Sequence, residues 1–101
     1  MYITNIKHFL DLSGNIPEKM PQQARERANF FALVIDATTK NSPQKLTSTE
    51  IKCFQKGCHG SIKSEVLKPN NEIHWVCSKC QNEGRISEWQ KTKWDNRVFR
   101  K

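Results

Sequence analysis

Apolar residues in the first half of the chain recur at the spacing of a helix. Ala24, Ala28, Phe31 and Ile35 follow one another at intervals of four, three and four residues, which places their side chains on one face of a helix. Charged and amide side chains lie off that face. The pattern predicts a helix over residues 21–39.

The second half of this predicted helix is apolar on more than one face. Five of the six residues from 30 to 35 have large apolar side chains, namely Phe30, Phe31, Leu33, Val34 and Ile35. One interpretation is a core helix that is buried on two sides within a single chain. The other is an interaction surface, through which residues 21–39 contact a protein partner or form a homodimer. The pattern favours the first interpretation and leaves the second open.

Beyond residue 60, apolar residues alternate with polar ones, as is typical of strands. Ile62 and Val66 share one face of a first strand, and Ile73 and Trp75 share one face of a second. We therefore expect strands over residues 61–68, 73–77 and 83–87. The opening segment fits either a helix or a strand, and we interpret it as a short strand or an extended arm.

The segment after the predicted helix, residues 41–50, has one large apolar side chain and a composition typical of a linker. We therefore divide the chain into an N-terminal arm and helix (1–40), a linker (41–50), a ribbon of strands (51–89) and a basic aromatic tail (90–101). The fold class that follows is α+β. We expect the helical N-terminal region to pack beside a small, antiparallel C-terminal sheet.

All four cysteines of the chain lie in the predicted ribbon, as two close pairs. Four residues separate Cys53 from Cys58, two separate Cys77 from Cys80, and 18 residues lie between the pairs, enough for a β-hairpin. Two such pairs predict a tetrahedral zinc site. We expect one structural Zn²⁺ bound by all four thiolates. We also expect positive φ angles at the glycines that follow the two pairs, Gly60 and Gly84.

Four bound thiolates leave no open coordination position, so the metal is expected to stabilise the fold and not to catalyse a reaction. His59 and His74 lie near the cysteines and are weaker candidates as ligands. No serine–histidine–acid set, phosphate-binding glycine loop or carboxylate pair stands out in the sequence. We therefore predict that the chain is not an enzyme.

The cysteines would also suit a disulfide-bonded secreted protein. However, the first 14 residues contain no apolar stretch long enough for a signal peptide, and the longest apolar run, residues 30–35, is too short to span a membrane. The mean hydropathy of −0.77 is that of a polar globular chain. We expect a cytoplasmic protein without membrane association, whose reduced thiols are available to metal.

The net charge of +7 is concentrated at the C-terminus. Residues 89–101 carry five basic side chains and one acidic one, whereas the excess over residues 1–88 is only +3. Cations interleaved with aromatic residues can neutralise phosphates while bases stack. The tail is therefore predicted to bind DNA or RNA through Lys91, Lys93, Arg97, Arg100 and Lys101. For Trp89 and Trp94 we prefer a second interpretation, in which both fold back and cover the ribbon.

Several short motifs give the chain a family resemblance over most of its length. They are residues 1–6 with 8–10, Gly14 to Pro17, Cys58 to Ile62, and Glu83 to Ser87 followed by Trp89, Trp94 and Asp95. With these motifs the chain resembles short, uncharacterised bacterial zinc-ribbon proteins that begin with an arm and a helix. The resemblance implies cysteine-bound zinc and a bacterial cytoplasmic setting, and it implies no activity. The first cysteine pair departs from the common ribbon pattern, in which two residues separate the ligands.

Overall fold

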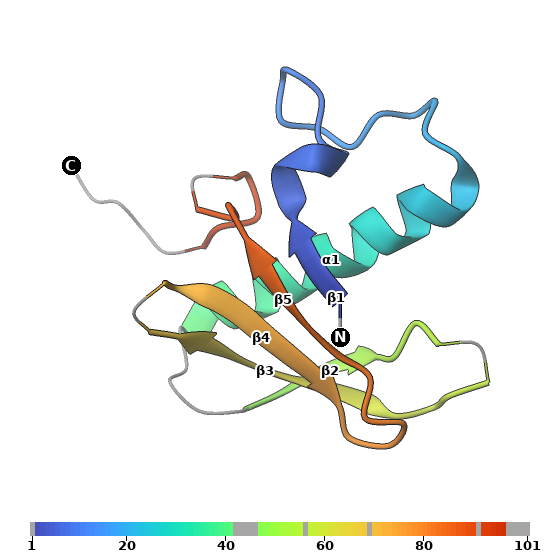
Figure 1. The fold of residues 1–101 in the computed structure, drawn as a ribbon, viewed down its shortest axis with the longest axis vertical. Helices are drawn as coiled ribbons and strands as arrows, with labels where there is room; N and C mark the ends of the chain where they lie inside the picture. The colour runs from blue at the N-terminus through green and yellow to red at the C-terminus, as the bar shows by residue number, and fades with distance from the viewer. Residues whose placement is uncertain (1, 42–46, 56, 69, 91, 97–101) are drawn as a thin grey trace.

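In the computed structural model, a helix crosses one face of a five-stranded sheet (Figure 1). The structure describes residues 2–41, 47–55, 57–68, 70–90 and 92–96. In chain order, the elements are β1 (Tyr2–Asn5), the 3₁₀ helix η1 (Ile6–Phe9), α1 (Gln22–Asn41), β2 (Thr47–Lys52), β3 (Ser61–Leu67), β4 (Glu72–Cys77) and β5 (Glu83–Ser87). The predicted helix and the three predicted C-terminal strands are present, with ends within two residues of those expected.

The strands lie in the order β1-β5-β4-β3-β2. Strands β2 to β5 form an antiparallel meander, and β1 pairs in parallel with β5 at one edge. Helix α1 connects β1 at one edge with β2 at the other (Figure 1). The structure thereby corrects the expected arrangement. The sheet is mixed and takes strands from both sides of the helix, because the N-terminal arm satisfies the backbone hydrogen bonds of the β5 edge.

Strand β2 includes residues that the composition assigned to a linker. Ser48 lies opposite Lys63 of β3, and the Thr49 hydroxyl donates to the carbonyl oxygen of Ile62 at 2.8 Å. As an edge strand, β2 is well served by polar side chains, which discourage pairing with other chains. Its polar composition therefore resembles that of a linker. Of the predicted linker, residues 42–46 lie outside the described part of the chain.

Helix α1 buries its apolar side chains against the sheet. Those that are at most 6% exposed include Ala28, Phe30, Phe31, Val34 and Ile35. Farther along the helix, Thr38 Oγ1 lies 2.6 Å from the hydroxyl oxygen of Ser64 on β3, a buried polar contact between helix and sheet. Among the large apolar residues of the described helix, Leu33 alone is exposed. Both apolar faces are thus covered within a single chain.

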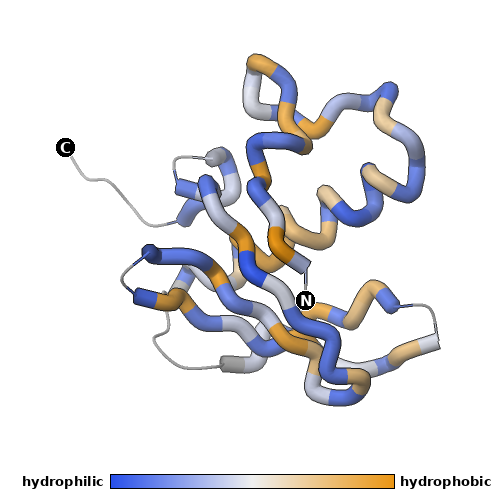
Figure 2. The backbone as a smooth tube through the Cα atoms, in the orientation of Figure 1, coloured by the Kyte–Doolittle hydropathy of each residue, from blue (hydrophilic) through white to orange (hydrophobic). Residues whose placement is uncertain are grey.

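The core centres on Trp75 of β4, whose side chain is fully buried. Its ring stacks on Tyr2 of β1 with 5.9 Å between centroids and meets Phe30 of α1 edge-on at 5.1 Å. Aromatic pairs in these geometries add to the stabilisation from burial alone. Hydrophobic and hydrophilic residues both occur along the strands (Figure 2), and in β4 the buried residues, such as Ile73 and Trp75, occupy every second position. One core therefore joins the N-terminal arm, the helix and the ribbon.

Trp89 also belongs to this core. It is fully buried, and its Nε1 donates to the carbonyl oxygen of Asn71 at 2.7 Å. Trp94 is partly buried and packs against the same cluster. The preferred interpretation is thus confirmed for Trp89, which folds back onto the ribbon, whereas Trp94 packs against the shared core.

Gly84 of β5 is required for space and not for an unusual backbone conformation. A Cβ atom at this position would lie 2.6 Å from the carbonyl oxygen of Tyr2 and 2.8 Å from the ring of Trp75. The expected positive φ is absent at both Gly84 and Gly60, whereas Gly14 and Gly57 have φ of 82°. The glycine at position 84 is thus explained by the close packing of β1 and Trp75 against β5.

Replacing Gly84 with alanine is expected to lower the free energy of unfolding by about 3 kcal/mol, because a backbone carbonyl and a buried ring must move apart. Gly14→Ala is the matched control. Its Cβ would meet nothing within 4 Å, so it should cost about 1 kcal/mol from the positive φ alone. Chemical denaturation of both variants measures the difference. Equal losses would show that the contact between β1, β5 and Trp75 is looser than described.

Candidate metal centre

The meander brings the two cysteine pairs to the same end of the sheet. Cys53 and Cys58 lie in the connection from β2 to β3, and Cys77 and Cys80 lie at the connection from β4 to β5. In an antiparallel meander these two connections share one end, and the β3–β4 turn lies at the other. The register places Cys77 directly opposite Ile62, close to the first pair. Topology alone therefore positions the four thiols together.

The four Sγ atoms form a compact cluster, in which all lie within 4.8 Å of one another. Cys53 Sγ is 3.7 Å from Cys80 Sγ, and Cys58 Sγ is 3.6 Å from Cys77 Sγ. These separations far exceed a disulfide bond of about 2.05 Å, and all four cysteines are free thiols. The predicted set is brought together in full, and it can coordinate a metal ion.

Backbone amides surround the sulfur atoms in both connections. The N–H groups of Gln55, Gly60 and Lys79 each donate, at 3.4 Å, to the Sγ of the cysteine two positions earlier. Cys80 N–H also donates to Cys77 Sγ at 3.5 Å. Hydrogen bonds to sulfur stabilise the thiolate form, which is the form that coordinates metals.

The wider first connection closes through its own hydrogen bonds. Cys58 N–H donates to the carbonyl oxygen of Gln55, and Cys53 N–H donates to that of Gly60, both at 2.9 Å. Gly57 has the positive φ of 82° that this four-residue spacing uses for its turn. The side chains of Asn82 and Gln55 then link the two connections by a hydrogen bond of 3.2 Å.

Gly60 lies against the sulfur cluster. A Cβ atom there would lie 2.5 Å from Cys77 Sγ and 2.7 Å from the Cβ of Lys79. Because both neighbours belong to the opposite connection, only glycine lets the two connections approach this closely. The residue is therefore part of the site, although it contributes no ligand.

Burial and hydrogen bonding act in opposite directions on the thiols. Burial raises the pKa of Cys53 to about 12. Burial also acts to raise the pKa of Cys77, but the amide hydrogen bonds from Cys80 and Lys79, with the Cys58 thiol, outweigh it and lower that pKa to about 6. The hydrogen bonds thus favour the thiolate form of Cys77, which is the form that binds metal.

Neither candidate histidine joins the cluster. His59 is exposed. His74 lies on the face of the sheet away from the helix, where Nδ1 is 2.8 Å from Glu65 Oε2 and Nε2 is 2.9 Å from Glu83 Oε1. This cross-strand network joins β3, β4 and β5 and was missed by the sequence analysis. The available signal was the recurrence of ionisable residues at the outward positions of three adjacent strands.

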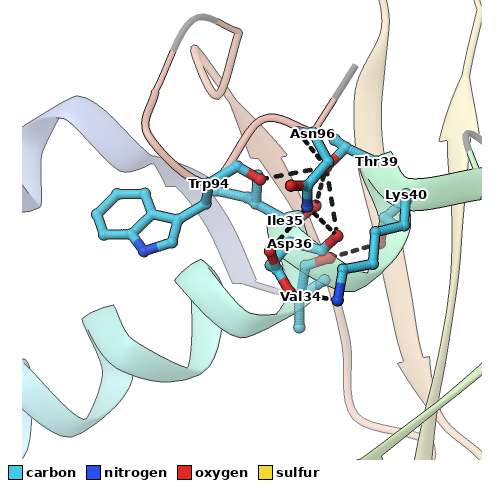
Figure 3. Close-up of polar contacts among 8 residues, drawn as sticks. Val34, Ile35, Asp36, Thr39, Lys40, Trp94 and Asn96 are labelled. Carbon is cyan, nitrogen blue, oxygen red and sulfur yellow. Dashed lines mark hydrogen bonds and ion pairs between the residues drawn. The ribbon is translucent and has the colours of Figure 1, made fainter. Parts of the chain in front are cut away.

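The described part of the basic tail is attached to the end of helix α1 (Figure 3). The backbone N–H of Asn96 donates to Thr39 Oγ1 at 2.8 Å, and the Asn96 side-chain amide donates to Asp36 O at 2.8 Å and to Asp36 Oδ1 at 2.7 Å. The Thr39 hydroxyl contacts the carbonyl oxygen of Trp94 at 3.2 Å. Trp94 and Asn96 are therefore held beside the C-terminal end of the helix.

One of the five predicted nucleic-acid-binding residues lies within the described residues. Lys93 is exposed, its Nζ is 5.4 Å from the centroid of the Trp94 ring, and it donates to Asn15 Oδ1. The other four, Lys91, Arg97, Arg100 and Lys101, lie outside the described part of the chain.

Comparison of the chain with protein-family models, with curated proteins and with solved structures finds no match. The fold and the cysteines define the class of the protein, which is a small α+β chain with a four-cysteine cluster able to coordinate a metal ion. This class is compatible with the zinc-ribbon resemblance. Within the described residues, no helix combines the length and the apolar character needed to cross a membrane.

Replacing Gly60 with alanine is expected to weaken metal binding roughly tenfold, the scale on which residues supporting the ligands act. The added methyl group forces Cys77 Sγ away from the other sulfurs. Ser78→Ala, an exposed change beside the same cysteine, is the control and should bind metal normally. Competition titrations with a chromophoric chelator give both affinities. Unchanged affinity in Gly60→Ala would contradict the close approach described here.

Proposed function

We propose that the four cysteines bind one Zn²⁺ ion. The observation that carries this proposal is the spacing of the sulfur atoms. A tetrahedron whose centre lies about 2.3 Å from each sulfur, as in zinc thiolate sites, has edges of about 3.8 Å. Two of the sulfur pairs here are 3.6 and 3.7 Å apart, and all four sulfur atoms lie within 4.8 Å of one another. Four thiolates in such an arrangement favour zinc over magnesium or calcium, which prefer oxygen ligands.

The proposed role of the ion is structural. When bound, it supplies a cross-link between the β2–β3 and β4–β5 connections, and the four thiolates leave it no open position for a substrate. Small metal-bound folds derive much of their stability from this link, because their own cores are small. We place the chain in a reducing cytoplasm, where thiols stay available to metal. There it acts as a non-enzymatic module.

We propose further that this module binds nucleic acid through its basic C-terminal tail. The support comes from the charge of residues 89–101, with five basic side chains against one acidic one, and from the anchoring of Asn96 to helix α1. Because the tail is attached to the helix at Asn96, it loses less conformational entropy when it binds. The face of the sheet away from the helix is a less suitable surface for phosphates. On it, Glu65 and Glu83 pair with His74, and Glu72 pairs with Arg85.

The alternative, a protein-interaction module that uses helix 21–39, has less support. The apolar side chains that would form its contact surface are buried against the sheet of the same chain. Within the described helix, Leu33 is the one large apolar residue left exposed, and a single exposed leucine is ordinary for a protein surface.

Purified protein is expected to contain one zinc per chain by elemental analysis. Removing it with a chelator should lower the helical circular dichroism signal and shift the tryptophan emission to longer wavelength together, because Trp75 and helix α1 share one core. Adding zinc back should restore both signals. Zinc-free protein with its cysteines paired in disulfides by mass would overturn the zinc proposal.

Binding to single-stranded DNA or RNA is expected to weaken steeply as salt rises. Replacing Lys91, Lys93, Arg97, Arg100 and Lys101 with glutamine should reduce the slope of log K against log salt by up to about 3.5, since each phosphate contact on a single strand contributes about 0.7. Fluorescence anisotropy with a labelled oligonucleotide measures this slope.

The matched control removes the same charge from other surfaces. Lys7, Lys19, Lys52, Lys63 and Lys68 are all exposed, and their replacement with glutamine should leave most of the slope in place. Equal effects of the two sets would mean that net charge acts and not the tail. Salt-insensitive binding, or none, would refute the nucleic-acid proposal.

A further inference from the structure

A cleft of about 480 Å³ lies between the N-terminal arm and the first half of helix α1. The arm contributes Tyr2 and Thr4 of β1 with Phe9 of η1, and the helix contributes Gln23, Ala24, Arg27 and Phe31. Three of these residues are aromatic, one is a cation and none is acidic. This lining combines apolar walls with a few polar groups, as small-molecule sites do.

Arg27 differs from the other arginines that the structure describes. Arg25 donates to the carbonyl oxygen of Glu18 at 2.9 Å, and Arg85 forms an ion pair with Glu72 at 3.7 Å. The guanidinium of Arg27 instead lies over two rings, 4.3 Å from the centroid of Phe54 and 5.3 Å from that of Tyr2. No described carboxylate or carbonyl oxygen bonds to it, although its side chain is half-buried.

A half-buried guanidinium without an acceptor loses hydration that no protein group replaces. Stacking on aromatic rings leaves its N–H groups available at the ring edges, where they suit a planar anion. Arg27 lies between this cleft and a second hollow, which it lines together with Gln23, Glu26, Phe54 and Gln55. Glu26 accepts from the Gln22 amide at 3.1 Å and forms no ion pair with Arg27 among the described residues. Arg27 can therefore offer its charge to a ligand in the cleft beside the arm.

We propose that this cleft binds a small aromatic anion, with its ring against Tyr2, Phe9 and Phe31 and its carboxylate or phosphate on Arg27. The aromatic walls favour a flat ring, because the Phe9 and Phe31 rings already lie 5.9 Å apart in a tilted pair that a third ring can extend. The side chains of Gln23 and Thr4, which line the same cleft, offer further hydrogen-bonding groups. The inference goes beyond the proposed nucleic-acid function, since none of the tail residues that the structure describes (90 and 92–96) lines this cleft.

The test uses the zinc-loaded full chain, isotope-labelled and titrated by NMR with three probes of similar shape. Phenylacetate and phenyl phosphate carry the anion, and phenylacetamide lacks it. We expect saturable shifts at the cleft with at least one anion and binding about tenfold or more weaker with the amide. Tighter binding of phenylacetate indicates a carboxylate ligand, and tighter binding of phenyl phosphate indicates a nucleotide-like one.

Two variants and one control assign the binding to this cleft. Arg27→Gln should weaken the anions about tenfold or more, and Ala24→Leu should block the cleft while keeping the charge. Arg25→Gln removes the same charge two residues away and should bind normally. Absence of saturable binding, equal binding of phenylacetamide, or equal losses in Arg25→Gln and Arg27→Gln would each overturn the proposal. The oligonucleotide titration is independent of these outcomes, so either proposal can fail alone.

Discussion

The shared end of the β2–β5 meander is the constraint on which the rest of the structure depends. At that end two connections must approach until four sulfur atoms lie within 4.8 Å of one another, and Gly60 permits this because any side chain there would collide with Cys77. A sheet held together at this point presents Trp75 to the helix at a defined position. With 101 residues the chain buries a limited core, so the close approach of these two connections matters to the stability of the whole sheet.

The core extends this constraint to the N-terminal half. Tyr2 stacks on Trp75 from β1, and Phe30 meets the same ring from α1, so the arm and the helix are parts of the ribbon's own core. Gly84 allows β1 to lie against β5 at that point. The arm and the helix also form the cleft beside Arg27. The packing around Trp75 therefore shapes the proposed ligand site as well.

Much of the secondary structure and the whole thiol set follow from local patterns. The stripe from Ala24 to Ile35 predicted the helix, and the alternation around Ile73 and Trp75 predicted a strand. The cysteine spacing identified four thiols that do converge. Strand β2 was missed because an edge strand lacks the alternating apolar residues that mark interior strands, and the parallel pairing of β1 was missed because its partner lies some 80 residues away.

By itself, the sequence determined which side chains are apolar and at what period, which four residues are thiols, and where positive charge accumulates. These properties reside in residue types and short spacings. Only the tertiary structure decided that Gly60 and Gly84 are needed for space, that His74 pairs with two glutamates instead of a metal, and that Arg27 lines a cleft and stacks on two aromatic rings. Those outcomes depend on which distant segments meet, and pairings between distant segments are set by the packing of the whole core.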